Sequence, residues 1–166
     1  MTKNADRLQY FTQNYARTDL AQRPFIRFEA VNGAKLGDKI HDMVSAKVWL
    51  GLHFLKTAKV RLGDQQLTHG MIGCYLSHYA IWEQATKPYT IVFEDDAVVY
   101  PAIYKSVIRY IVEEPGPFPA DWDIILLGHH CIGCTGGNTF YKHPKNFWGT
   151  HGYIISRKGQ IGRAHV

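Results

Sequence analysis

Apolar residues along this chain follow two spacings, the continuous runs of buried strands and the three-to-four-residue repeat of helices. Runs rich in β-branched, aromatic and aliphatic residues at 89–93 (YTIVF), 122–127 (WDIILL) and 152–156 (GYIIS) favour buried strands. A looser alternation at 25–31 (FIRFEAV) predicts a further strand, which ends in the turn-forming pair Asn32-Gly33.

Helical spacing recurs between these strands. Asp6 is placed to cap a first helix, Asp38 starts a second, 70–85 has the broadest apolar stripe, and Pro101 lies in the first turn of another. Residues 49–69 mix apolar and charged positions and predict only a short helix. The apolar faces consist of Leu8, Phe11 and Tyr15; Ile40, Met43 and Val44; Ile72, Leu76 and Tyr79; and Ile103, Val107, Ile108 and Ile111.

Strands that alternate with helices predict an α/β fold with a mostly parallel sheet flanked by helices. In such sheets, ligands bind at the carboxyl ends of the strands. Polar residues follow two of the predicted strands: 94–96 (EDD) after the first buried run and 128–130 (GHH) after the second. The sequence therefore predicts a binding site at this end of the sheet.

Three consecutive carboxylates at a strand end are electrostatically costly. Glu94, Asp95 and Asp96 carry like charges at close range, which repel one another unless a cation neutralises them. Oxygen ligands suit Mg²⁺ or Mn²⁺, and either ion can hold a diphosphate. The alternative is an acidic turn that caps the following segment.

The composition is that of an ordinary globular domain. The 166 residues are 46% hydrophobic and 20% charged, and no apolar run approaches a membrane span or a secretion signal. A net charge of +5 favours anionic partners, but the basic residues form no cluster, so nucleic-acid binding is not predicted. An odd count of 3 Cys predicts free thiols and a reducing, cytoplasmic location.

A small cluster of metal-ligating residue types follows the second buried run. His129, His130, Cys131 and Cys134 contain a single CxxC pair, and a structural zinc site needs four ligands in a suitable arrangement. A zinc-binding interaction module is therefore a third, distant hypothesis.

Five blocks together resemble the lipooligosaccharide glycosyltransferases of family 25, which are β-1,4-galactosyltransferase-like bacterial enzymes. They are AVNGAKLGDK at 30–39, LTHGMIGCYLSHYAIWEQA at 67–85, YTIVFEDDA at 89–97, WDIILLGHH at 122–130 and GTHGYIISRKG at 149–159. The resemblance implies a GT-A-like nucleotide-binding domain over 1–159, followed by a non-family tail at 160–166.

The implied reaction is the transfer of a hexose, with galactose as the leading candidate, from a UDP-sugar to a lipooligosaccharide glycan. The implied cofactors are Mn²⁺ or Mg²⁺ and a UDP-sugar donor such as UDP-galactose. Such an enzyme would act in the cytoplasm and contact the anionic inner membrane peripherally, where the +5 charge helps.

The resemblance also implies roles for particular residues. Asp95, Asp96 and His151 would bind the metal, and the donor would be contacted by Arg7, Asn32, Gly33, Ser77, His78 and Asp95. Each has a structural alternative: a turn histidine for His151, helix packing for Ser77 and His78, and a solvated helix end for Arg7.

Inversion at the sugar carbon would need a base for the acceptor hydroxyl. Glu94, His129 and His130 lie at the correct strand ends for this role, although the two histidines would equally serve as a loop anchor.

Two departures from the family predict a copy truncated at both ends. Only two residues stand where the family begins with an apolar strand, and 160–166 (QIGRAHV) does not resemble the family. The alternative function is therefore an inactive remnant that folds but binds donor weakly or not at all. A missing strand would expose a sheet edge through which two copies of the chain could pair.

Overall fold

The structure is a computed structural model, and it describes residues 3–46, 48–49, 68–114, 117–137, 141–143 and 146–163. The chain forms two compact units: unit 1 contains Met1–Ile26 and Ala85–Val166, and unit 2 contains Arg27–Gln84. Most of the short helix predicted at 49–69 lies outside the described residues.

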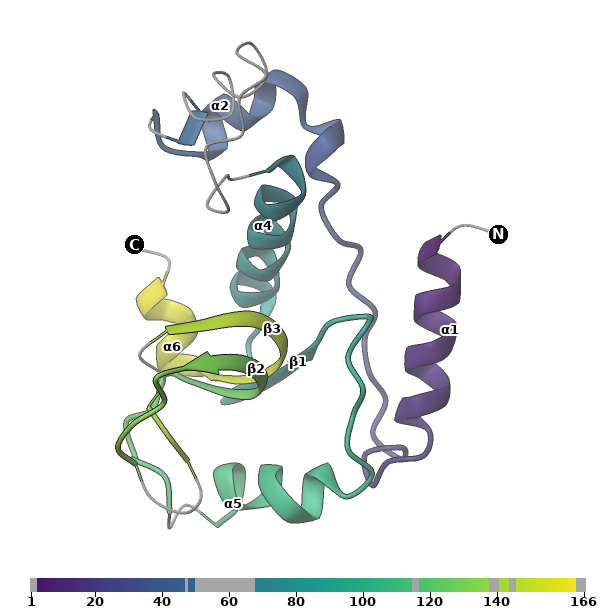
Figure 1. Ribbon diagram of the computed structural model, residues 1–166, viewed down its shortest axis with the longest axis vertical. Helices are drawn as coiled ribbons and strands as arrows, with labels where there is room; N and C mark the ends of the chain where they lie inside the picture. Colours follow the sequence, from purple (N-terminus) through teal and green to yellow (C-terminus); the bar gives the residue numbers. More distant parts are fainter. Residues whose placement is uncertain are drawn as a thin grey trace. The chain divides into compact units, whose positions relative to one another are not determined.

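A three-stranded sheet forms the centre of unit 1 (Figure 1). It contains β1 (Tyr89–Phe93), β2 (Ile124–Ile132) and β3 (Asn146–Ser156) in the order β1-β3-β2, and β3 is antiparallel to both neighbours. The predicted α/β class is confirmed.

The mostly parallel sheet is not seen among the described strands, whose two pairings are both antiparallel. The helical connection from β1 to β2 makes these two strands run in the same direction, as predicted. However, the described part of the connection from β2 to β3 contains no crossover helix, and a strand that returns without one pairs antiparallel.

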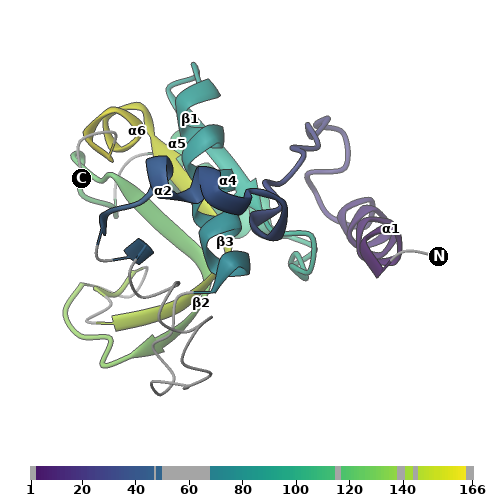
Figure 2. The ribbon, with the colours of Figure 1, turned by 90° about the horizontal axis from the view of Figure 1, so that it is seen from above.

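The helix α6 (Arg157–Arg163) continues from the end of β3 (Figure 2). The Arg157 guanidinium donates a hydrogen bond to the Ala85 carbonyl, which ties α6 to the chain just before β1. In the described part of the chain, no helix is long and apolar enough to cross a membrane.

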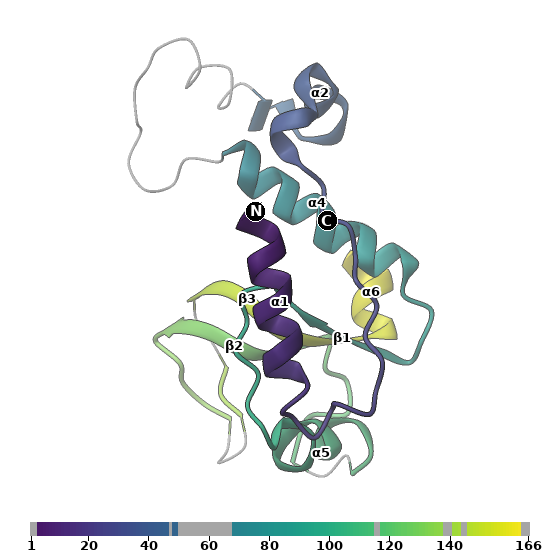
Figure 3. The same ribbon diagram turned by 90° about the vertical axis from the view of Figure 1, so that its right-hand side faces the viewer.

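The core of unit 1 lies between the sheet and its helices. The helix α1 (Lys3–Tyr15) packs on the sheet (Figure 3), where the ring of Phe11 lies 6.2 Å from that of Phe93. The apolar faces predicted for α1 and for the segment after Pro101 are confirmed. The latter forms a π-helix, η4 (Tyr104–Ile108), and α5 (Arg109–Val112). The predicted residues buried here are Phe11, Tyr15, Ile103, Ile108 and Ile111.

Asp6 does not cap α1, contrary to prediction. The helix begins at Lys3, so Asp6 lies within the first turn. A carboxylate in the first turn still interacts favourably with the positive end of the helix dipole, which explains why the residue type suits this region.

Polar side chains near the end of α1 hold the segment that follows the three acids. The Asn14 side-chain oxygen accepts a hydrogen bond from the Val99 N–H at 2.6 Å. The Asp19 carboxylate accepts from the N–H groups of Tyr104 and Lys105, both at 2.9 Å. The chain between β1 and η4 is therefore held at its middle by Asn14, and the start of η4 is held by Asp19.

The described residues of unit 2 form two short 3₁₀ turns, η1 (Gly33–Lys35) and η2 (Gly37–Lys39), and the helices α2 (Ile40–Met43) and α4 (His69–Gln84). The helix predicted at 70–85 is confirmed within one residue at each end. Ile40 and Ile72 form the centre of a small core.

The strand predicted at 25–31 is wrong, because these residues are irregular. Ile26 is 95% exposed, and the Val31 N–H donates to the Ser77 hydroxyl at 2.8 Å instead of to a strand. The alternating apolar pattern predicted a strand, but among the described residues no strand pairs with this segment.

Two glycines allow η1 to approach α4 closely. A Cβ at Gly73 would lie 2.5 Å from the Val31 carbonyl oxygen and 2.7 Å from the Gly33 amide nitrogen. We predict that Gly73→Ala lowers the free energy of unfolding by about 1–3 kcal/mol, because backbone atoms cannot move aside cheaply. Urea unfolding monitored by circular dichroism would measure this change.

The matched control is Gly70→Ala in the same helix, whose Cβ would meet only the Thr68 hydroxyl oxygen at 3.7 Å. This variant should be neutral or slightly stabilising, since alanine favours helices more than glycine does. Equal effects of the two substitutions would contradict the close approach.

Candidate functional site

The three acids form a tight turn directly after β1. The Ala97 N–H donates to the Glu94 carbonyl at 3.1 Å, so Asp95 and Asp96 occupy the two central positions of a β-turn. Ala97 is buried and fixes the exit of the turn. The carboxylates therefore lie where the strand ends, as the sequence predicts.

β3 is longer than predicted and carries a bulge beside this turn. Gly128 pairs with Gly152 and His130 pairs with Trp148, so β3 has two more residues than β2 over this interval. Gly149 lies in the bulge with a φ of 80°. Bulges redirect side chains next to functional sites, and here the redirected residues are Thr150 and His151.

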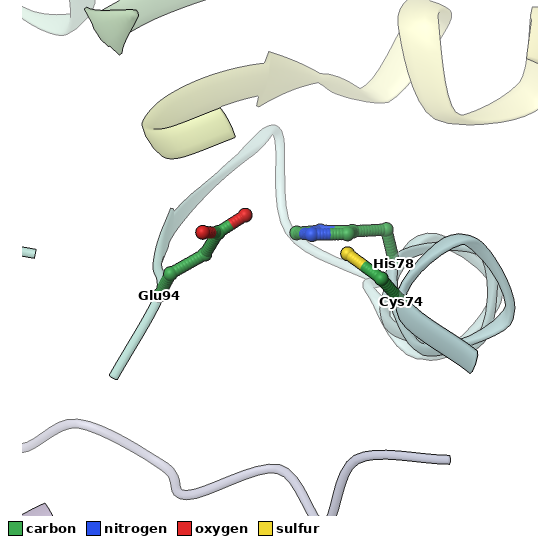
Figure 4. A group of neighbouring side chains, drawn as sticks. All are labelled: Cys74, His78 and Glu94. Carbon is green, nitrogen blue, oxygen red and sulfur yellow. The ribbon is translucent and has the colours of Figure 1, made fainter. Parts of the chain in front are cut away.

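Side chains from the turn and the bulge converge. The Nδ1 atom of His151 lies 3.7 Å from a Glu94 carboxylate oxygen and 3.9 Å from one of Asp96. Figure 4 shows Glu94 extending from the chain after β1. One ligand atom from each of these three residues lies within 4.8 Å of the others. The Thr150 hydroxyl donates to the other Glu94 oxygen at 2.5 Å.

Arg7 of α1 provides a positive charge on the other side of the turn. Its guanidinium lies 3.4 Å from an Asp95 oxygen and 3.9 Å from an Asp96 oxygen. The three side chains are between 45% and 49% exposed, so solvent screens the pairing and leaves the guanidinium accessible to a further anion.

The donor set fits a divalent cation. Two carboxylates suit Mg²⁺ or Mn²⁺, whereas an imidazole ligand is typical of transition metals, so the combination of Glu94, Asp96 and His151 favours Mn²⁺. Of the three acids and the histidine expected at the metal site, the structure brings Glu94, Asp96 and His151 together. Asp95 pairs with Arg7 instead.

The predicted donor contacts in unit 2 have well-defined local roles. The Asn32 side chain caps η1 by accepting from the Ala34 N–H at 3.1 Å, and a Cβ at Gly33 would overlap the His69 carbonyl. Ser77 is buried, and its hydroxyl donates to the Gly73 carbonyl at 2.6 Å, which is the packing alternative raised from the sequence.

His78 lies one turn after Cys74 on α4, and both side chains project from the same face of the helix (Figure 4). Cys74 is a free thiol, as the sequence predicts, and the structure shows that it is exposed.

The predicted free thiol at Cys134 is wrong, because this residue is disulfide-bonded. A disulfide sulfur cannot act as a thiolate ligand, so the zinc hypothesis loses one of its four residues. His129 and His130 belong to β2, with His130 opposite Trp148, but their side chains lie outside the description.

Thr150 is the residue at this site that the sequence analysis missed. The strand was predicted to begin at Gly152, which placed 149–151 in a turn. The sequence signal of the bulge was a glycine at 149, a residue type that often marks bulges, and the structure gives this glycine a positive φ of 80°.

Comparison with known proteins shows what the chain is similar to. It matches glycosyltransferase family 25, described as an LPS biosynthesis protein, over residues 1–160. A glycosyltransferase 25 family member of Anopheles gambiae is 30% identical over 142 residues, or 80% of this chain and 22% of that protein. Procollagen galactosyltransferase 1-A of Xenopus laevis is 29% identical over 120 residues, or 66% of this chain and 19% of that protein.

The human inactive glycosyltransferase 25 family member 3 is 33% identical over 82 residues, or 48% of this chain and 14% of that protein. The chain thus spans between 14% and 22% of the length of these relatives. All three are animal proteins, so they do not support the bacterial origin implied by the resemblance.

The conformation of Gly149 controls where the His151 ring lies. A Cβ at Gly149 would lie 2.9 Å from the Nε2 atom of His151. We predict that Gly149→Ala costs about 1–2 kcal/mol, since its φ is positive, and also moves the His151 ring. Urea unfolding and the ¹H–¹⁵N signals of the imidazole would measure the two effects.

Gly37→Ala separates these effects. Gly37 also has a positive φ, of 54°, but a Cβ there would have no neighbour within 4 Å. This control should lose stability without shifting the His151 signals. Unchanged His151 signals in Gly149→Ala would contradict the prediction.

Proposed function

The chain belongs to glycosyltransferase family 25, and we propose that it is a metal-dependent glycosyltransferase that moves galactose from UDP-galactose to a lipooligosaccharide glycan. The observation that carries this proposal is the convergence of Glu94, Asp96 and His151 at the end of β1. The relatives named as procollagen galactosyltransferases support galactose as the transferred sugar.

The metal would be held by Glu94, Asp96 and His151, and Mn²⁺ suits this set better than Mg²⁺. When bound, such an ion would neutralise the diphosphate of the departing nucleotide. The half-exposed carboxylate of Asp96 and ring of His151 would leave the site open to solvent and to a donor.

Arg7 would contact the diphosphate of the donor. A guanidinium has five N–H donors in a planar fork that matches phosphate oxygens, and the link from Arg7 to Asp95 would orient it toward the same turn. The donor contacts proposed for Asn32, Gly33 and His78 rest on the family blocks at 30–39 and 67–85.

Transfer with inversion would require a base to take the proton of the acceptor hydroxyl. Glu94 is already engaged by Thr150 and His151. This arrangement suits a metal ligand better than a base, so His129 and His130 are the residues of β2 that we propose to test first for this role.

The acceptor has two candidate sources. The family description favours a lipopolysaccharide-type glycan, whereas relatives are named for procollagen. A net charge of +5 supports a peripheral approach to an anionic inner membrane, where a lipid-linked glycan would be found. Turnover of UDP-galactose in the presence of each acceptor would separate these alternatives.

The second candidate is a chain that has the family fold but no transferase activity. Relatives from Bos taurus and Homo sapiens are named as probable inactive and inactive members of the family, and this observation favours it. Such a chain would give no galactose transfer or UDP-galactose hydrolysis with any acceptor, whether or not it binds UDP.

We predict that UDP binds in a Mn²⁺-dependent manner and that Asp96→Asn weakens this binding at least ~10-fold. Loss of a ligand should cost no less than loss of an outer-shell partner, which costs about 10–100-fold. Isothermal titration of UDP with Mn²⁺ and then with EDTA would measure the effect.

Asp123→Asn is the matched control, because Asp123 precedes β2 at the opposite end of the sheet and pairs with Lys158. This variant should bind UDP like the original protein. Binding that is equally strong in EDTA, or unaffected by Asp96→Asn, would contradict the proposed metal site.

A further inference from the structure

At the candidate site, Glu94 accepts a hydrogen bond from Thr150, a residue that is not one of the three proposed metal ligands. The Thr150 hydroxyl donates to the Oε1 atom of Glu94 at 2.5 Å. The two residues are 56 positions apart in the chain, and the bond is partly buried. A second bond joins the same segments, because the Glu94 N–H donates to the His151 carbonyl at 3.0 Å.

These two bonds hold both ends of Glu94. The backbone bond fixes its position relative to β3, and the Thr150 hydroxyl fixes the direction of its carboxylate. With Oε1 engaged, Oε2 is the oxygen that faces the Nδ1 atom of His151 at 3.7 Å. A long, flexible side chain is thereby restricted before any ligand arrives.

The bulge in β3 makes this arrangement possible. Successive side chains of a regular strand point to opposite faces of the sheet. Thr150 and His151 are successive, yet both reach the carboxylate of Glu94, because β3 has extra residues between Gly152 and Trp148.

We infer that Thr150 is a positioning residue that sets the affinity of the site for Mn²⁺ by holding the Glu94 carboxylate with Oε2 toward Asp96 and His151. This inference rests on the proposed function, since it concerns the same metal site. It assigns Glu94 as a metal ligand instead of the acceptor base. Outer-shell hydrogen bonds of this type orient ligating carboxylates and raise metal affinity.

The test is a titration of the protein with Mn²⁺ alone, in which the electron paramagnetic resonance signal of free aqueous Mn²⁺ reports the unbound ion. Thr150→Val removes the hydroxyl but keeps the branched shape, and we expect it to weaken Mn²⁺ binding about 10-fold or more. Thr150→Ser keeps the hydroxyl and should restore affinity to within about threefold of the original, since the same hydrogen bond can form.

Thr12→Val is the matched control, because the Thr12 hydroxyl bonds to the Leu8 carbonyl on the exposed side of α1. It should leave Mn²⁺ affinity unchanged. In a Glu94→Gln background, Thr150→Val should have little further effect, since the two residues act through one ligand. If Thr150→Val does not fold cooperatively, Thr150→Ala is measured in its place, with the same expected loss.

The outcomes distinguish this inference from the proposed function. Normal Mn²⁺ binding by the original protein with no loss in Thr150→Val or Thr150→Ala would overturn the positioning role alone. A loss that Thr150→Ser does not restore would also overturn it, since the hydroxyl would not be the cause. Failure of the original protein to bind Mn²⁺ would overturn both the metal site and the role of Thr150.

Discussion

The hydrogen bond from the Glu94 N–H to the His151 carbonyl joins the end of β1 to the bulge of β3. It forms because β1 and β3 pair antiparallel, with Phe93 opposite Gly152, so that the residue after β1 faces His151. This pairing brings the last residue of β1 next to the bulge of β3, at the same end of the sheet. Residues that are 56 positions apart in the chain, Glu94 and Thr150, thus meet.

Charge is the second constraint on this part of the molecule. Glu94, Asp95 and Asp96 place three carboxylates within one turn, and their mutual repulsion must be offset. Two positively charged or chargeable side chains share this role, because Arg7 lies beside Asp95 while His151 lies between Glu94 and Asp96. All these groups retain access to solvent, which weakens the pairings and leaves Glu94, Asp96 and His151 accessible to a cation.

The sequence predicted the strand at 89–93 and the long helix of unit 2, because continuous apolar runs and helical spacing are local signals. The approach of His151 to the acids was expected only from the resemblance to family 25. It did not predict the antiparallel order, since the direction of β3 depends on the connection before it. The bulge was missed because its extra residues, including Thr150, are polar and resemble a loop. The strand prediction at 25–31 was wrong for the opposite reason. The pattern of these residues resembles a strand, but no partner strand is present among the described residues.

Binding of one Mn²⁺ ion by His151 together with the acidic turn underlies both the proposed function and the role of Thr150. Electron spin echo envelope modulation of the Mn²⁺-loaded protein examines this coordination, because a directly bound imidazole nitrogen modulates the echo. We expect a ¹⁴N modulation that disappears in His151→Gln. Bound Mn²⁺ without ¹⁴N modulation, or a modulation that survives this substitution, would show that His151 is not a ligand.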